Sequence, residues 1–228
     1  MNQLQTLGII MDGNRRFARE HGWPAVKGHR LGLNKMKEVL GWARAAGIKT
    51  VFLYAFSTEN WRRSRTEVTA LMILFKKFLQ TEVAELIKEK TRLVFIGESE
   101  HLSPRLKKLM DAATAATRAG KNFTLVIAFS YGGRPEIIAA TKLFAARYQT
   151  KLDSVGEKEF SQCLWTAGLP DPNLIIRTGG ERRLSNFLPW QSVYSELYFT
   201  PTYWPAFTRA EFDSIIADYH QRHRRYGQ

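Results

Sequence analysis

The feature that most constrains the fold is a regular alternation of short apolar runs with longer stretches of helical periodicity. The apolar runs are rich in β-branched and aromatic residues, and several end in a polar turn. The strands expected from this pattern are 8–11, 49–57, 92–97, 123–129, 173–176 and 196–200. Because each intervening stretch is long enough for a crossover, the sequence predicts an α/β fold with a central, mainly parallel six-stranded sheet flanked by helices.

Capping signals mark where several of the expected helices begin. The residue pairs predicted to start a helix are Ser64 with Glu67, Ser103 with Pro104, Ser154 with Glu157, and Thr208 with Glu211. A further helix is expected over 136–148, and Gly47 and Gly120 are expected to end the helices before them. The segment 21–32 is dense in glycine, proline and basic residues, so we predict a loop there.

Composition bounds the size of the chain and the nature of its partners. With 228 residues and 44% hydrophobic content, we expect a single domain over residues 1–228. The 34 basic residues against 21 acidic ones give a formal net charge of +13, which favours a nucleic acid, an anionic lipid or a phosphorylated small molecule as partner. No signal-like N-terminus and no apolar run of membrane-spanning length occurs, so a cytoplasmic protein is expected.

The first expected strand ends in a group of residues suited to an anion. Asp12 follows the strand directly, Gly13 lets the backbone approach a ligand, and Asn14 tolerates left-handed turns. Arg15 and Arg16 add forked donors for phosphate oxygens. The Asp12 carboxylate would repel a phosphate bound by these arginines. We therefore predict a hard cation, Mg²⁺, between the carboxylate and the phosphate. An ordinary strand-to-helix turn with surface arginines explains these residues equally well.

A second basic group follows the expected strand 173–176. It combines guanidiniums, a hydroxyl and two glycines with accessible amides, a set suited to a diphosphate. Its members are Arg177, Gly179, Gly180, Arg182, Arg183 and Ser185. A solvated basic loop is the alternative, but the apolar residues on both sides favour a site. Glu196 lies further along, and from the residues alone it is better interpreted as a structural carboxylate than as a second acid of the site.

Several familiar signatures are missing. No G-x-x-x-x-G-K-[ST], G-x-G-x-x-G or D-D-x-x-D motif occurs, so nucleotide hydrolysis and dinucleotide redox chemistry lose support. The single cysteine, Cys163, excludes an internal disulfide and a cysteine zinc cluster, and we interpret it as a packing residue. Many arginines fall in turns rather than on one face between aromatics, so no nucleic-acid partner is predicted.

A family resemblance spans essentially the whole chain. The chain resembles the cis-prenyltransferases, most closely the bacterial undecaprenyl diphosphate synthases, in the runs IIMDGNRRFA, GHRLG, YAFSTENWRR, SYGGRPEI and LIIRTGGERRLSNFLPWQSVYSELYF. The resemblance implies Mg²⁺-dependent condensation of isopentenyl diphosphate with an allylic diphosphate such as farnesyl diphosphate. It also implies a homodimer, an apolar tunnel at one side of the sheet, and the undecaprenyl lipid carrier for cell-wall synthesis as product. A short- or medium-chain product and a non-catalytic partner subunit are the alternatives.

The resemblance implies roles for individual residues. Asp12 would hold Mg²⁺ and assist departure of the allylic diphosphate, Asn60 would help to organise the reacting ends and remove the proton, and Glu196 would be a second metal ligand. The implied substrate-binding residues are Gly13, Asn14, Arg15, Arg16, Trp23, His29, Ser57, Thr58, Glu59, Trp61, Arg63, Arg177, Arg183 and Ser185. The segment 225–227 resembles a tail that reaches the site of a neighbouring subunit.

One departure from the family pattern bears on substrate preference. Ala25 stands where an arginine usually helps to bind the allylic diphosphate, so either Lys27 or Arg15 replaces it or the preferred substrate differs. The tunnel is expected along 67–87 and 54–56, although plain core packing explains most of these residues individually. The basic segment 220–225 is expected to contact anionic lipid at the inner face of the cell membrane.

Overall fold

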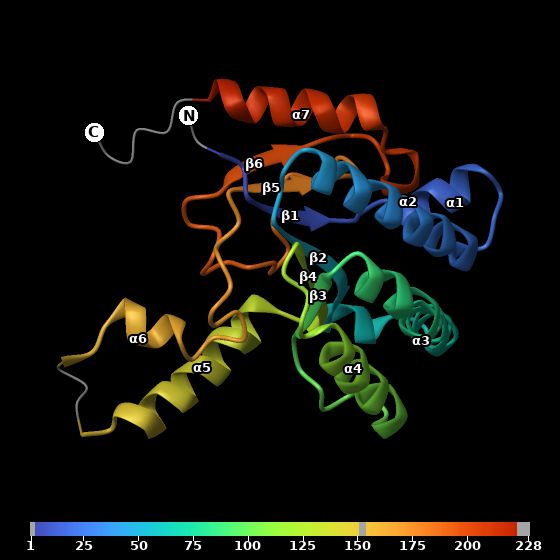
Figure 1. Ribbon diagram of the computed structural model, residues 1–228. Coiled ribbons are helices and arrows are strands. Elements are labelled where there is room, and N and C mark those ends of the chain that lie inside the picture. Colours follow the sequence, from blue (N-terminus) through green and yellow to red (C-terminus); the bar gives the residue numbers. More distant parts are fainter. Residues whose placement is uncertain (1–2, 151–153, 223–228) are drawn as a thin grey trace.

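A six-stranded parallel sheet organises the chain (Figure 1). The computed structural model describes residues 3–150 and 154–222. The strands are β1 (Thr6–Ile10), β2 (Thr50–Ser57), β3 (Thr91–Ile96), β4 (Phe123–Tyr131), β5 (Leu174–Arg177) and β6 (Glu196–Phe199). Their order is β3-β4-β2-β1-β5-β6, and every pairing among the described residues is parallel. The predicted α/β class and sheet are therefore confirmed.

Helices cover both faces of this sheet. They are α1 (Asn14–Glu20), α2 (Ala25–Ala45), α3 (Arg65–Lys88), α4 (Pro104–Thr117), α5 (Gly133–Tyr148), α6 (Glu157–Ser161) and α7 (Arg209–Gln221), with 3-10 turns η1 (Thr58–Arg62) and η3 (Trp204–Ala206). The larger core packs α2, α3, α4 and α7 against one face, where Leu53 and Phe212 are buried. On the other face Phe52 packs with Phe187. Helices α5 and α6 pack side by side with the buried Cys163 (Figure 1).

Most of the predicted helix starts are confirmed. The hydroxyls of Ser64, Ser103 and Thr208 accept hydrogen bonds from the first-turn amides of α3, α4 and α7. The prediction for α6 was wrong, because this helix begins after Gly156 and not after Ser154. There the amide of Gly156 donates to the carboxylate of Glu159 at 2.9 Å.

The predicted loop over 21–32 is confirmed for 21–24 and was wrong from Ala25 onward, since α2 begins there, directly after Pro24. Two glycines inside α2 have a packing role that cannot be seen from the composition of the segment. A Cβ added at Gly28 would lie 2.1 Å from the carbonyl oxygen of Asn14, and one added at Gly32 would lie 2.1 Å from the Asn14 side-chain oxygen. The glycines therefore let α1 approach α2 closely, which fixes Asn14 beside the carboxyl end of β1.

Two predictions concern parts of the chain near its end. Among the described residues, no helix is both long and apolar enough to cross a membrane. The tail 225–227 and half of the basic segment 220–225 lie outside the described residues.

Candidate active site

A cleft of about 1240 Å³ lies where the carboxyl ends of β1, β2 and β5 meet. This is the edge at which parallel α/β sheets bind ligands. The cleft is lined by Ile10, Met11, Asp12, Gly13, Asn14, Arg15, Arg16, Arg19, Gly22, Trp23, Ala25, His29, Tyr54, Ala55, Ser57, Glu59, Asn60, Arg63, Leu71, Arg134, Arg177, Ser185, Asn186 and Pro189. Most of the predicted site residues are therefore brought together in one cleft.

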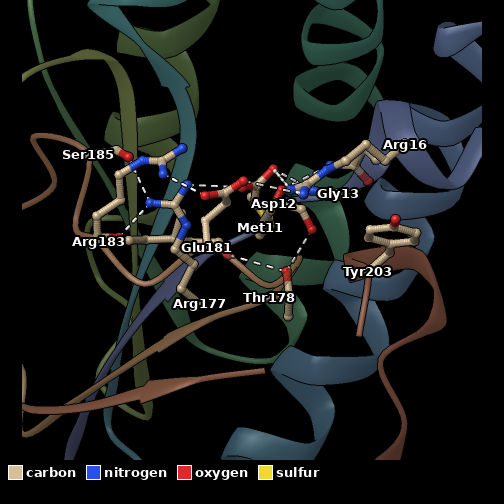
Figure 2. A network of polar contacts seen from close by, with 12 residues as sticks. Met11, Asp12, Gly13, Arg16, Arg177, Thr178, Glu181, Arg183, Ser185 and Tyr203 are labelled. Carbon is tan, nitrogen blue, oxygen red and sulfur yellow. Dashed lines mark hydrogen bonds and ion pairs between the residues drawn. The ribbon is translucent and has the colours of Figure 1, made fainter. Parts of the chain in front are cut away.

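Asp12 lies at the centre of the polar network in the cleft (Figure 2). One carboxylate oxygen accepts a hydrogen bond from Arg177 at 2.9 Å, and the other accepts one from the Gly13 amide at 2.6 Å and pairs with Arg16 at 3.1 Å. The Asp12 side chain is 30% exposed, whereas Arg177 is only 5% exposed. A carboxylate in this position is held firmly by the protein and is still open to a ligand from the cleft.

The turn after β1 requires glycine at position 13. Gly13 has φ of 101°, a conformation that other residues rarely adopt. A Cβ at this position would also lie 2.6 Å from the ring of Tyr203. The same ring faces the guanidinium of Arg16 at 5.4 Å, so Tyr203 orients this arginine toward the cleft (Figure 2).

A second polar group surrounds the buried carboxylate of Glu67 on α3. Its Oε1 atom lies 3.0 Å from Arg63, 3.6 Å from Arg15 and 3.7 Å from His29. Burial, followed by the positive charge of Arg63, lowers the pKa of His29 to about 4, and Glu67 opposes this shift only in part. His29 is therefore neutral at neutral pH. The charged partners of Glu67 in this group are Arg63 and Arg15.

The turn after β2 holds the residues predicted from the STENWRR run. Asn60 closes this turn, because its side-chain oxygen accepts a hydrogen bond from the Ser57 amide at 3.1 Å. Burial alone would raise the pKa of Glu59, but hydrogen bonds from its own backbone and from Asn186 hold it below its ordinary value. Trp61 points away from the cleft, where its ring NH donates to Ser130 at 2.9 Å and its ring packs on Phe56.

The loop after β5 folds around the guanidinium of Arg177. Arg177 donates to the hydroxyl of Ser185 at 2.7 Å and to the backbone carbonyl of Arg183. Ser185 and Asn186 both have positive φ, at 50° and 69°, so the loop turns sharply at this point. The hydroxyl of Tyr54 donates to the Ser185 carbonyl at 3.2 Å and supports the turn from below.

Four of the residues that the family resemblance implies for the site lie outside the lining of the cleft, as do Gly179, Gly180 and Arg182 of the second basic group. The Thr58 hydroxyl donates to Glu59 at 3.3 Å, and the ring NH of Trp61 donates to Ser130 at 2.9 Å. The side chain of Arg183 pairs with Glu181 at 2.5 Å (Figure 2). Glu196 was expected to share a metal site with Asp12, and within this chain it does not. It starts β6, at the opposite edge of the sheet, and pairs with Arg222 at 2.8 Å.

Three polar side chains of the lining were not predicted from the sequence. Arg19 on α1, Arg134 on α5 and Asn186 all face the cleft. Arg134 belongs to the polar turn SYGGRPE after β4, which could have indicated it. Asn186 was harder to predict, because its contacts are with residues far away in the sequence. It accepts a hydrogen bond from the Arg134 amide at 2.8 Å and donates one to Glu59 at 3.1 Å.

Ala25 lines the cleft at the position where the family resemblance implies an arginine. Arg15 and Arg19 line the same cleft and add positive charge to it. The ammonium of Lys27 lies 3.4 Å from the ring centroid of Trp23, and Lys27 does not line the cleft. Of the two expected replacements for the usual arginine, Arg15 therefore fits and Lys27 does not.

The residues of the cleft fit a magnesium ion held jointly with a substrate. Mg²⁺ is commonly bound by one or two carboxylates together with substrate phosphates and water. Asp12 supplies one such carboxylate, at the open end of a cleft rich in arginine. Among the described residues no group of three acidic, histidine or cysteine side chains could hold a metal ion alone.

An apolar cavity of about 110 Å³ adjoins the cleft. Met11, Asn14, His29, Ala55 and Leu71 line both spaces. The other residues around the cavity are Gly32, Leu33, Met36, Leu53, Phe56, Leu74, Phe75, Phe78, Ile127, Phe129 and Trp204. Ala55 and Phe56, expected to line a tunnel, are among them, whereas Tyr54 lies in the polar cleft.

Comparison with known proteins shows the family to which this chain belongs. The family model described as putative undecaprenyl diphosphate synthase matches residues 10–227. An isoprenyl transferase of Agrobacterium fabrum is 46% identical over 97% of this chain and 91% of that protein. The ditrans,polycis-undecaprenyl-diphosphate synthase ((2E,6E)-farnesyl-diphosphate specific) of Micrococcus luteus is 44% identical over 97% of this chain and 90% of that protein.

Solved structures give the same result. Lavandulyl diphosphate synthase from Lavandula x intermedia, in complex with dimethylallyl diphosphate, has a TM-score of 0.95 and 34% identity, and the match covers 99% of each chain. A probable undecaprenyl diphosphate synthase from Campylobacter jejuni has a TM-score of 0.83 and 32% identity, covering 100% of each chain. The chain therefore belongs to the undecaprenyl diphosphate synthase family of prenyltransferases and is an enzyme of that class.

Proposed function

We propose that the cleft binds two diphosphates side by side and catalyses Mg²⁺-dependent cis-prenyl chain elongation, in which isopentenyl diphosphate condenses with an allylic diphosphate. The observation that carries this proposal is the 2.9 Å hydrogen bond from Arg177 to Asp12, which joins the first anion cradle to the loop after β5. Because β1 and β5 are neighbours in the sheet, the two basic groups share one carboxylate. Such a shared arrangement suits a reaction between two diphosphate substrates.

The allylic diphosphate would lie against the residues after β1. Gly13 allows it close to the backbone, and Arg15, Arg16 and Arg19 would stabilise the negative charge that grows as the diphosphate leaves. Asp12 would hold Mg²⁺, which when bound neutralises diphosphate charge and so assists departure of the leaving group. The neutral ring of His29, on the same wall, would keep the region beside the carbon chain free of a further charge.

Isopentenyl diphosphate would bind on the other side of Asp12. Arg177 and Ser185, with Arg183 from the same loop, would hold its diphosphate. The allylic C–O bond then breaks, the double bond of isopentenyl diphosphate supplies the electrons for the new C–C bond, and one proton is lost from the added unit. Asn60 and Ser57, held together in the turn after β2, would orient the group that takes this proton.

Two products are candidates. The names of the relatives favour undecaprenyl diphosphate, grown from farnesyl diphosphate. Its use as the lipid carrier for cell-wall synthesis is part of what the family resemblance implies. A short-chain product is the second candidate, because the apolar cavity that shares lining residues with the cleft has a volume of only about 110 Å³.

The proposed surroundings of the enzyme follow from the same family. We propose a homodimer in the cytoplasm, with membrane contact through its product and the basic segment 220–225. Strand β6 is at the edge of the sheet, and Val193 and Tyr194 before it are 69% and 74% exposed, which supports association with a second copy. Light scattering at several protein concentrations tests the dimer, and a monomer throughout would refute it.

One assay tests the proposed reaction. Labelled isopentenyl diphosphate is supplied with dimethylallyl, geranyl, farnesyl or geranylgeranyl diphosphate, each with Mg²⁺ and with a chelator, and the products are separated by chain length. We expect Mg²⁺-dependent incorporation of label with at least one primer. A complete absence of product with every primer would refute prenyl transfer and favour a non-catalytic partner subunit.

A further inference from the structure

The apolar cavity beneath the cleft is small for its expected role. The residues that it shares with the cleft, such as Ala55 and Leu71, mark its mouth. A cavity of roughly 150 Å³ holds one benzene molecule, so a cavity of 110 Å³ accommodates about one five-carbon unit. A lipid of about eleven such units would need on the order of ten times this space.

Stacked phenylalanine rings close the end of the cavity away from the cleft. Phe75, Phe78 and Phe129 line the cavity but not the cleft. The ring centroids of Phe75 on α3 and Phe129 on β4 are 3.9 Å apart, with an angle of 12° between their planes. Phe56 on β2 also stacks on Phe129, with ring centroids 5.3 Å apart and an angle of 27° between their planes.

These rings are locked by their neighbours. Phe56, Phe75 and Phe129 are 2%, 9% and 4% exposed, and Phe75 also contacts Phe78 and Phe95 at 6.3 Å and 6.0 Å between centroids. Interiors packed at this density leave a ring no room to rotate unless its neighbours move too. A growing hydrocarbon chain would therefore have to separate several aromatic contacts at once to pass between α3 and β4.

We propose that the stacked pair Phe75–Phe129 is the stop for chain growth, so that this enzyme makes a short prenyl diphosphate of about two to three isoprene units. This inference rests on the proposed function. Each addition breaks the allylic C–O bond, forms one C–C bond and releases diphosphate and a proton. After the first additions, the far end of the chain meets the two rings and the product leaves.

Substitution of the stop tests the proposal. Phe129→Ala and Phe75→Ala are compared with wild type in the labelled assay with dimethylallyl and geranyl diphosphate as primers and excess isopentenyl diphosphate. Phe129→Leu and Phe75→Leu are included because they retain more of the core. Phe52→Ala and Phe52→Leu are the matched controls: Phe52 is fully buried on the opposite face of the sheet and lines neither space. Thermal melting shows which variants are folded.

The expected result is a wild-type product that stays short at all times and substrate ratios. Folded variants at positions 75 and 129 should make products longer by at least about one isoprene unit, and the Phe52 controls should match wild type. A wild-type product near eleven units, or unchanged lengths in folded position-75 and position-129 variants, would overturn the stop while leaving prenyl transfer intact. No product with any primer would instead overturn the proposed function, and this inference with it.

Discussion

Arg177 donates to Asp12 at 2.9 Å across neighbouring strands, and this contact connects the two basic groups of the cleft. The arginine is almost completely buried, and it also donates to Ser185 at 2.7 Å. Its position is thus fixed by the fold, whereas Asp12 faces both the arginine and the open cleft. The pair joins a side chain fixed by the fold to one that is open to a ligand, and substitutions of Asp12 test its proposed role.

Substitution of Asp12 should abolish turnover and leave the protein folded. In Asp12→Asn the amide oxygen can still accept from Arg177, so the buried guanidinium keeps a partner, but the ligand charge for Mg²⁺ is lost. We expect kcat to fall by at least about 100-fold in Asp12→Asn and Asp12→Ala, as for loss of one strong transition-state contact. Steady-state kinetics and circular dichroism measure both effects. Near-normal activity in either variant would refute the role of Asp12.

Tyr54 should act as a positioning residue for the isopentenyl diphosphate side. Its hydroxyl supports the sharp turn at Ser185, and burial raises its pKa, so it stays protonated as a donor. Loss of one such hydrogen bond in Tyr54→Phe should raise the KM for isopentenyl diphosphate by about 3- to 10-fold. The expected change in kcat and in the KM for the allylic primer is below about twofold. Tyr198→Phe on β6 is the control, and an equal rise in both KM values would contradict this role.

The strands and the edge at which they end could be predicted because they depend on local patterns. Buried runs alternate with helical stretches, and a polar turn after a strand marks the carboxyl edge, so Asp12, Ser57 and Arg177 were expected at one site and meet there. The helical conformation of Gly28 and Gly32 could not be predicted, because local rules treat glycine as a helix breaker and these two glycines are required by a contact with Asn14 on another helix. Such a contact exists only once the tertiary structure has formed.

Side-chain direction was the second limit of prediction. Trp61 lies in the predicted motif, yet its ring faces Ser130 and Phe56 behind the cleft. Glu196 was assigned to the metal site through the family resemblance, yet it begins β6 at the far edge and pairs with Arg222. A motif specifies which residues occur in an element, and the register of the strand decides which edge they reach.

The buried carboxyl of Glu136 should make stability depend on pH. Burial raises its pKa, and the hydrogen bonds from Tyr131 at 2.5 Å and Gln191 at 3.1 Å oppose this only in part. Because the folded-state pKa lies above the unfolded value, its stabilising contribution is complete below the ordinary range of Glu and is lost as pH rises through the folded-state pKa.

Glu136→Gln removes this titration. The melting temperature of the variant minus that of wild type should therefore increase as pH rises above about 4.3, the ordinary pKa of Glu. Thermal melts across a pH series measure the difference, and Glu100→Gln, at an exposed position, is the control. A difference between Glu136→Gln and wild type that stays constant with pH would show that Glu136 has the same pKa in both states.

The close approach of α1 to α2 should make two glycines of α2 sensitive and leave a third tolerant. A Cβ at Gly32 would clash with the side-chain oxygen of Asn14, and a Cβ at Gly41, on the same helix, meets nothing within 4 Å. We expect Gly32→Ala to destabilise the protein by about 1 to 3 kcal/mol, as overpacking does. It should also raise the KM for the allylic primer, because Asn14 moves within the cleft.

Gly41→Ala removes backbone freedom from an exposed helix position without a clash, so it should stabilise the protein by up to about 1 kcal/mol. Chemical denaturation of both variants and of Gly28→Ala, followed by KM measurements, tests the pair of predictions. If Gly32→Ala were as stable as Gly41→Ala and kept its KM, then Asn14 would tolerate displacement, and the packing of α1 on α2 would not be what fixes the anion cradle after β1.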